Sequence, residues 1–173
     1  MVARTKIFDD VLVIFGDILF DSQILQQILA SNDDIAVAID LNWEKSYNEG
    51  LCNSHPLDEP VLINQKKVLR ISYKQADTMT ENQTVGEFLG VIKLSANGSR
   101  TIIKKYEELE KSHVGRFHDA NSLEKAKLVD ILQELIDSKI EISPITISGK
   151  WCEIDTPKDL ERAKEIFQNI DIE

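Results

Sequence analysis

The sequence has few of the residues that bring special chemistry or disulfide cross-links. Among its 173 residues there are only two cysteines, three histidines, four prolines and seven glycines. Cys52 and Cys152 have no metal-ligand spacing, so the cysteines indicate neither a zinc site nor a disulfide framework. Two free thiols are typical of a reducing compartment, and we expect a cytoplasmic protein.

Long apolar segments are also missing. No stretch approaches the roughly 18 apolar residues that a membrane-spanning helix requires. Residues 1–6 contain no apolar run of the kind found in a signal peptide. The sequence therefore predicts neither a membrane partner nor a secretory route.

Basic residues are outnumbered by acidic ones. There are 20 lysines and arginines against 30 aspartates and glutamates, giving a formal net charge of -10. Such a charge repels nucleic acid, and the sequence shows no segregated basic patch to overcome the repulsion. We expect no nucleic-acid partner. A nucleotide would need a cation or local lysines beside it.

What is present is the pattern of one α/β domain. Hydrophobic residues make up 42% of the chain, enough at this length for a single core. Apolar runs bounded by polar residues predict strands, and apolar residues three or four apart predict helices. We predict a mixed, mostly parallel sheet flanked by helices. The predicted strands cover 11–15, 35–39, 61–63, 68–73, 87–94 and 143–148, the predicted helices 22–31, 99–111, 122–136 and 157–167, and residues 42–60 are predicted as a loop.

Two aspartates follow buried-looking segments at opposite ends of the chain. Asp17 comes after the apolar run 11–15 and Gly16, at the strand mouth where open α/β sheets bind ligands. Asp155 follows Trp151 and precedes the helix predicted from residue 157. Each has a simpler interpretation. Asp17 could begin a turn, and the carboxylate of Asp155 could be there because the dipole of the helix that follows stabilises a negative charge at its N-terminus. If the two converge, they suffice for Mg²⁺, which takes one or two carboxylates plus water and phosphate oxygens.

Three further residues are weaker candidates. Lys150 could meet a phosphate or lie in solvent. Glu87 could hold a substrate amine or hydroxyl, or end a strand. Trp43 and Tyr47, one helical turn apart, could pack within the loop or form an aromatic cage for a quaternary ammonium group.

Residues 15–22, around Asp17, superficially match the first motif of haloacid-dehalogenase-type phosphatases. Those enzymes need a second aspartate two residues from the nucleophile. The positions two residues before and after Asp17 are Phe15 and Leu19. The general acid is therefore missing, and the phosphatase is a rival hypothesis of low rank.

Three segments in this order carry a stronger resemblance: residues 16–20 (GDILF), 86–90 (GEFLG) and 149–160 (GKWCEIDTPKDL). They resemble the later part of nucleotidyltransferases with the GT-A-like α/β fold of nucleotide-diphospho-sugar transferases. The resemblance is to the phosphocholine and 2-aminoethylphosphonate cytidylyltransferase group, whose domains also occur fused to phosphoenolpyruvate mutase-like enzymes. The third segment is the most specific.

The resemblance implies a reaction and a role for each candidate. A phosphate or phosphonate oxygen of a small acceptor would attack the α-phosphorus of a nucleoside triphosphate, with CTP favoured, and pyrophosphate would leave. Asp17 and Asp155 would share Mg²⁺ with the triphosphate. Glu87 would line the acceptor pocket near Trp43. The base stays open, as does the acceptor, with aminoethylphosphonate, phosphocholine and a sugar phosphate all possible.

The chain departs from this family at its beginning. The family starts with a strand, a glycine-rich loop of the form G-x-G-x-R and a lysine, and nothing here matches them. We expect residues 1–173 to be one domain that is the C-terminal portion of a nucleotidyltransferase, weakly active or inactive alone. Unpaired central strands would then favour a homodimer. The alternative is a non-catalytic binding or assembly module that keeps the fold.

Overall fold

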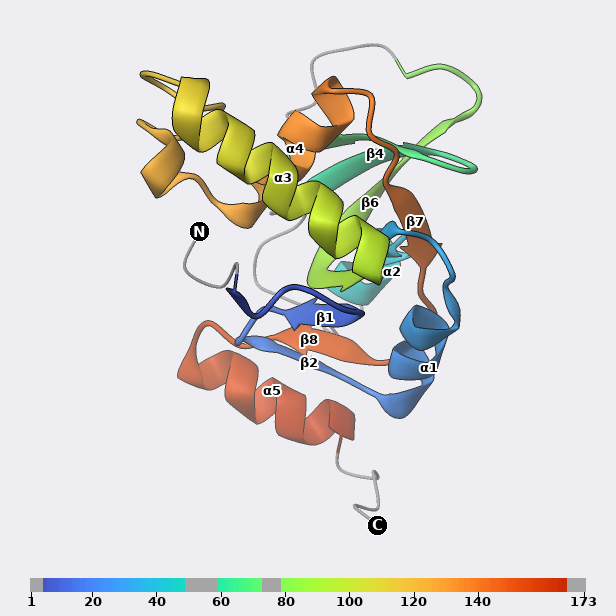
Figure 1. Ribbon diagram of the computed structural model, residues 1–173. Coiled ribbons are helices and arrows are strands. Elements are labelled where there is room, and N and C mark those ends of the chain that lie inside the picture. The colour runs from blue at the N-terminus through green and yellow to red at the C-terminus, as the bar shows by residue number, and fades with distance from the viewer. Residues whose placement is uncertain (1–4, 49–58, 73–78, 168–173) are drawn as a thin grey trace.

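The computed structural model describes residues 5–48, 59–72 and 79–167. Figure 1 shows a sheet with helices on both sides and a small two-stranded sheet beside it. The predicted mixed α/β class is confirmed. The elements in chain order are β1 (Val11–Ile14), β2 (Ile18–Phe20), α1 (Ser22–Ala30), β3 (Ile35–Asp40), α2 (Trp43–Asn48), β4 (Pro60–Asn64), β5 (Val68–Ile71), β6 (Gln83–Leu94), α3 (Ala96–Ser112), the 3-10 helix η2 (Leu123–Lys125), α4 (Leu128–Asp137), β7 (Ser143–Thr146), β8 (Trp151–Glu153) and α5 (Pro157–Phe167).

The long strand β6 organises the main sheet. Its first half pairs with β4 and its second half with β1, while β3 pairs along its other edge, all antiparallel. β5 pairs antiparallel with β4, and the one parallel ladder described is β3 with β7. The expectation of a mostly parallel sheet is therefore wrong. β1 and β3 do run in the same direction, but β6 lies between them in the opposite direction.

Both faces of this sheet are covered. The odd-numbered residues of β3 join α3 and α4 in one apolar cluster, as expected from the alternation of side chains along a strand. Ala38 of β3 joins Ile24 and Ile28 of α1 and Trp151 of β8 in a second cluster on the opposite face. The two-stranded sheet of β2 and β8 thus packs beside α1, and α5 packs on β8 (Figure 1).

A glycine allows β6 to bend where three strands meet. The β3–β6 register jumps between Val37 and Ile39, which face Ile92 and Phe88, so β6 has a bulge there. Gly90 lies in this bulge with φ +71°, and a Cβ atom on it would come within 2.7 Å of the Phe15 ring. The Phe15 ring in turn packs edge-to-face against the Phe88 ring, with the two ring centroids 5.8 Å apart. The glycine explains how β1 approaches β6 so closely just before Asp17.

Most predicted elements are present, but several differ from the prediction. The segments 18–20 and 151–153 are strands that the sequence analysis did not predict, because three residues are too few to show a period. The predicted loop 42–60 contains the helix α2 and the start of β4, and its residues 49–58, including Cys52, lie outside the described residues. The helix predicted from residue 122 begins only at Leu128, because Ala126 and Lys127 are extended. The chain then turns into α4, where the Asp130 carboxylate accepts a hydrogen bond from the Lys127 amide at 2.7 Å.

Within the described part of the chain, no helix is long and apolar enough to cross a membrane.

Candidate metal centre

A short antiparallel ladder brings together two segments that lie far apart in the sequence. β2 pairs with β8 so that Ile18 faces Glu153 and Phe20 faces Trp151. One step beyond this ladder, the Ile154 amide donates a hydrogen bond to the Asp17 carbonyl oxygen at 2.8 Å. Since Asp155 follows Ile154 directly, the backbone itself holds the two predicted aspartates beside each other.

Their side chains converge as the sequence predicts. Carboxylate oxygens of Asp17, Glu153 and Asp155 all lie within 4.8 Å of one another. Oxygen donors of this kind are those Mg²⁺ binds, so the residues fit the cation implied by the resemblance. Three negative charges so close also favour a cation between them. The role of these residues as metal ligands stays a proposal.

Glu153 is the member that the sequence analysis did not select. It stands two residues before Asp155, and alternate residues of an extended segment point to the same side. The pattern Glu-Ile-Asp in residues 153–155 would have given this signal had β8 been predicted as a strand.

Lys150 makes contacts with other parts of the chain. Its backbone amide donates to the Asp21 carboxylate at 2.8 Å, and the other oxygen of Asp21 caps α1 by accepting from the Ile24 amide. Its ammonium group donates to the Ile166 carbonyl near the end of α5, at 3.0 Å. In this structure Lys150 therefore joins α1, β8 and α5, and a phosphate contact stays a prediction.

The start of α5 is fixed directly after Asp155. The Asp159 carboxylate accepts hydrogen bonds from the Thr156 amide at 2.9 Å and the Thr156 hydroxyl at 2.7 Å, and these contacts form a capping box. A guanidinium nitrogen of Arg162 lies 3.3 Å from the other carboxylate oxygen of Asp159. The Thr156 hydroxyl is the main cause of a lowered Asp159 pKa, and it outweighs the effect of burial. In its charged form Asp159 thus stabilises the start of α5, and with it the segment that carries Asp155.

Glu87 and Trp43 do not join the three carboxylates. Glu87 is buried in β6 opposite Asp40, and its Oε1 accepts a hydrogen bond from the Glu59 amide at 3.2 Å. Trp43 is half-buried at the start of α2, while the side chain of Tyr47 lies outside the description. Their roles at an acceptor pocket stay predictions.

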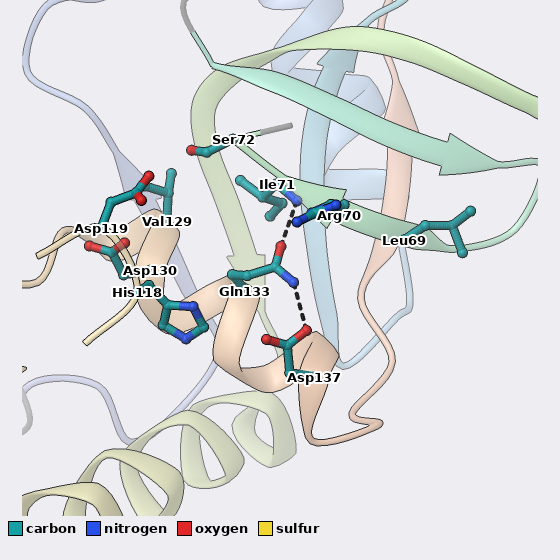
Figure 2. Close-up of a pocket in the computed structure, with 10 residues that line it drawn as sticks. All are labelled: Leu69, Arg70, Ile71, Ser72, His118, Asp119, Val129, Asp130, Gln133 and Asp137. Atoms are coloured by element: carbon teal, nitrogen blue, oxygen red, sulfur yellow. Dashed lines mark hydrogen bonds between the residues drawn. The ribbon is translucent and has the colours of Figure 1, made fainter. Parts of the chain in front are cut away.

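A separate cavity of about 560 Å³ lies between β5, α4 and the segment around His118 (Figure 2). Gln133 lies in its wall, accepting from the Ile71 amide at 2.9 Å and donating to Asp137 at 2.8 Å. Its ten lining residues include none of the predicted site residues. Nothing in the sequence signals this cavity, because its walls come from segments with no shared motif.

Comparison with known proteins shows which proteins this chain resembles. No family model matches the chain. CTP:phosphoglutamine cytidylyltransferase from Campylobacter jejuni is 24% identical over 152 residues, which are 88% of this chain and 58% of that protein. A crystal structure from Bacillus anthracis, described as a glucose-1-phosphate thymidylyltransferase in complex with a sucrose, matches 99% of this chain and 60% of its own, with a TM-score of 0.60 and 13% identity.

The chain has a nucleotidyltransferase fold. Its resemblance to cytidylyltransferases is confirmed, and it spans somewhat less than two thirds of each of these two proteins. This fold differs from that of haloacid-dehalogenase-type phosphatases and so argues against the phosphatase hypothesis.

Proposed function

We propose that this chain carries the metal-binding part of an enzyme that transfers a nucleotidyl group. The donor would be a nucleoside triphosphate, with CTP favoured, and the acceptor a small phosphate or phosphonate, with pyrophosphate released. The convergence of Asp17, Glu153 and Asp155 carries the proposal. The similarity to a CTP-dependent cytidylyltransferase supports the choice of CTP.

The chemistry explains why such a site is needed. Acceptor and triphosphate are both anions, and this protein has a net charge of -10. Mg²⁺ bound by the three carboxylates would neutralise phosphate charge and orient the triphosphate for in-line attack. The residues of the chain itself hold the geometry, since the β2–β8 ladder fixes Asp17 beside Asp155 and the Asp159 cap fixes the segment that follows.

The proposed division of labour follows from the share of the relatives that the chain covers. It spans 58% of the curated relative, so groups that hold the base and part of the triphosphate would lie in the remainder of a complete enzyme. We propose that the described chain is one domain corresponding to the C-terminal portion of such an enzyme, located in the cytoplasm. Glu87 and Trp43 are proposed to lie nearest the acceptor, and Lys150 is proposed to meet a substrate phosphate.

A binding module without turnover is the second candidate. The same partial coverage favours it, because a chain could keep the fold and the metal site and still lack the groups for catalysis.

The test is calorimetric titration of the full chain with CTP in the presence of Mg²⁺, repeated on Asp17→Asn and Asp155→Asn. Both substitutions should abolish Mg²⁺-dependent nucleotide binding. Asp33→Asn removes the same charge from an exposed residue before β3 and should leave binding unchanged. Equal binding by all four proteins would contradict the shared metal site. Pyrophosphate release with phosphocholine, 2-aminoethylphosphonate or a sugar phosphate then distinguishes an enzyme from a module.

A further inference from the structure

A buried carboxylate at the end of β3 is bound to β8, the strand that ends at the proposed metal ligand Glu153 and leads directly to a second one, Asp155. Asp40 is only 4% exposed. Its Oδ1 accepts a hydrogen bond from the Asn42 amide at 2.7 Å, and its Oδ2 accepts one from the indole Nε1 of Trp151 at 2.9 Å. A buried indole N–H without an acceptor is costly, so this bond determines how the Trp151 ring is placed.

The position of Trp151 determines where β8 lies. Trp151 is the first residue of β8 and Glu153 the last, so their side chains point to the same face of the strand. The indole packs with Ile24 and Leu89 in the cluster between α1 and the main sheet. β8 is thus held in two directions, by its ladder with β2 and by Trp151 against the end of β3.

We propose that Asp40 is a positioning residue of the metal centre, acting through Trp151 to hold Glu153 and Asp155 opposite Asp17. The inference depends on the proposed metal site and adds a residue to it. Asp40 is not a member of the carboxylate group that converges within 4.8 Å, so it acts on the ligands and not on the cation. Supporting groups of this kind commonly change metal affinity as well as stability.

The experiment measures Mn²⁺ affinity by electron paramagnetic resonance on the full chain, with the unfolding temperature of each protein measured in parallel. Asp40→Asn keeps the size of the side chain but offers one oxygen acceptor to two donors. Trp151→Phe removes the indole donor and keeps an aromatic ring, which makes it the milder variant. Both keep all three proposed ligands. Each should weaken Mn²⁺ binding about tenfold, the lower end of the range for supporting groups.

Asp130→Asn is the matched control. Asp130 is a buried carboxylate, 8% exposed, that accepts a backbone hydrogen bond at the start of α4. α4 packs on the sheet face opposite to Trp151, so this variant should lower the unfolding temperature without changing Mn²⁺ affinity.

The outcomes separate the two proposals. Wild-type Mn²⁺ affinity in Asp40→Asn or in Trp151→Phe would show that Asp40 is only a structural residue and would overturn this inference, leaving the metal site intact. A tenfold loss in Asp130→Asn as well would also overturn it, because the effect would then follow stability. Failure of the wild-type chain to bind Mn²⁺ would instead overturn the proposed metal centre, and this inference with it.

Discussion

The carbonyl oxygen of Asp17 accepts a hydrogen bond from the amide of Ile154 at 2.8 Å. This bond continues the β2–β8 ladder by one step and brings Asp17 next to Asp155, although one residue is near the start of the chain and the other near its end. A backbone contact fixes the two positions without depending on side-chain conformation. The carboxylates of Asp17 and Asp155 thus lie close together in the folded chain by itself.

The first prediction concerns the third carboxylate. Glu153→Gln replaces a charged oxygen donor with a weaker neutral one of the same size. We expect the affinity for Mn²⁺ or Mg²⁺ to fall at least about tenfold, equivalent to about 1.4 kcal/mol. Glu161→Gln on the exposed side of α5 removes the same charge and should have no effect. Unchanged metal affinity in Glu153→Gln would remove this residue from the ligand set.

The second prediction concerns the bulge in β6. Gly90→Ala introduces a side chain at φ +71° and within 2.7 Å of Phe15. Strain and overpacking together should lower the free energy of unfolding by about 2–4 kcal/mol, measured by urea denaturation. Gly16→Ala is the control, because a Cβ there has no neighbour within 4 Å. Similar losses in both variants would contradict the role given to the bulge.

The third prediction is a dependence of stability on pH. The Thr156 hydroxyl holds the pKa of Asp159 below its usual range. A carboxyl whose pKa is lower in the folded state stabilises the fold above its unfolded pKa of about 3.9, and this contribution disappears as the pH falls through the folded value. Asp159→Asn should therefore be less stable than the wild type at pH 7, and the difference should shrink below pH ~4. Thermal unfolding at several pH values measures it, and a difference independent of pH would be inconsistent with this origin.

The fourth prediction concerns an ion pair between α3 and α4. Lys105 contacts Glu134 at 2.8 Å, and His118 lies 3.2 Å from the other oxygen of Glu134. Burial raises the pKa of Glu134, but the hydrogen bond and charge of Lys105, together with those of His118, lower it overall. Glu134→Gln should cost about 1 kcal/mol of stability, because both partners are about four-fifths buried. The exposed pair of Lys164 and Glu161 should contribute less when broken by Glu161→Gln; equal losses would refute the distinction.

The fifth prediction is self-association. In the described part of the chain, β1 pairs with β6 along one edge and with no second strand. Ile14 at its end is 44% exposed. An apolar edge strand of this kind favours pairing between chains, and we expect a homodimer in sedimentation velocity. Ile14→Lys should shift the protein to monomer. A wild-type chain that is monomeric at all concentrations would exclude this association.

Local sequence was enough to predict many elements of the chain. The stripe of Ile24 and Ile28, the cap at Asp21 and the buried run of β3 each contain their own period or capping group. The capping box of Thr156 and Asp159 is likewise a contact between residues three apart. Such features depend on near neighbours, which the sequence displays directly. The two aspartates that begin or follow turns could also be identified as candidates from their local context.

The tertiary structure alone decided how these elements pair and which side chains complete the site. The order of β1, β6 and β3 depends on long-range pairing, which leaves no mark on the period of any single strand. β2 and β8 are too short to be predicted alone, and each is stable as a strand because the other supplies its hydrogen-bond partners. Glu153 as a third carboxylate, and Asp40 as the acceptor of the Trp151 indole, follow from that packing. Side chains distant in sequence meet only after the chain has folded, so their chemistry could be proposed from the sequence but their placement could not.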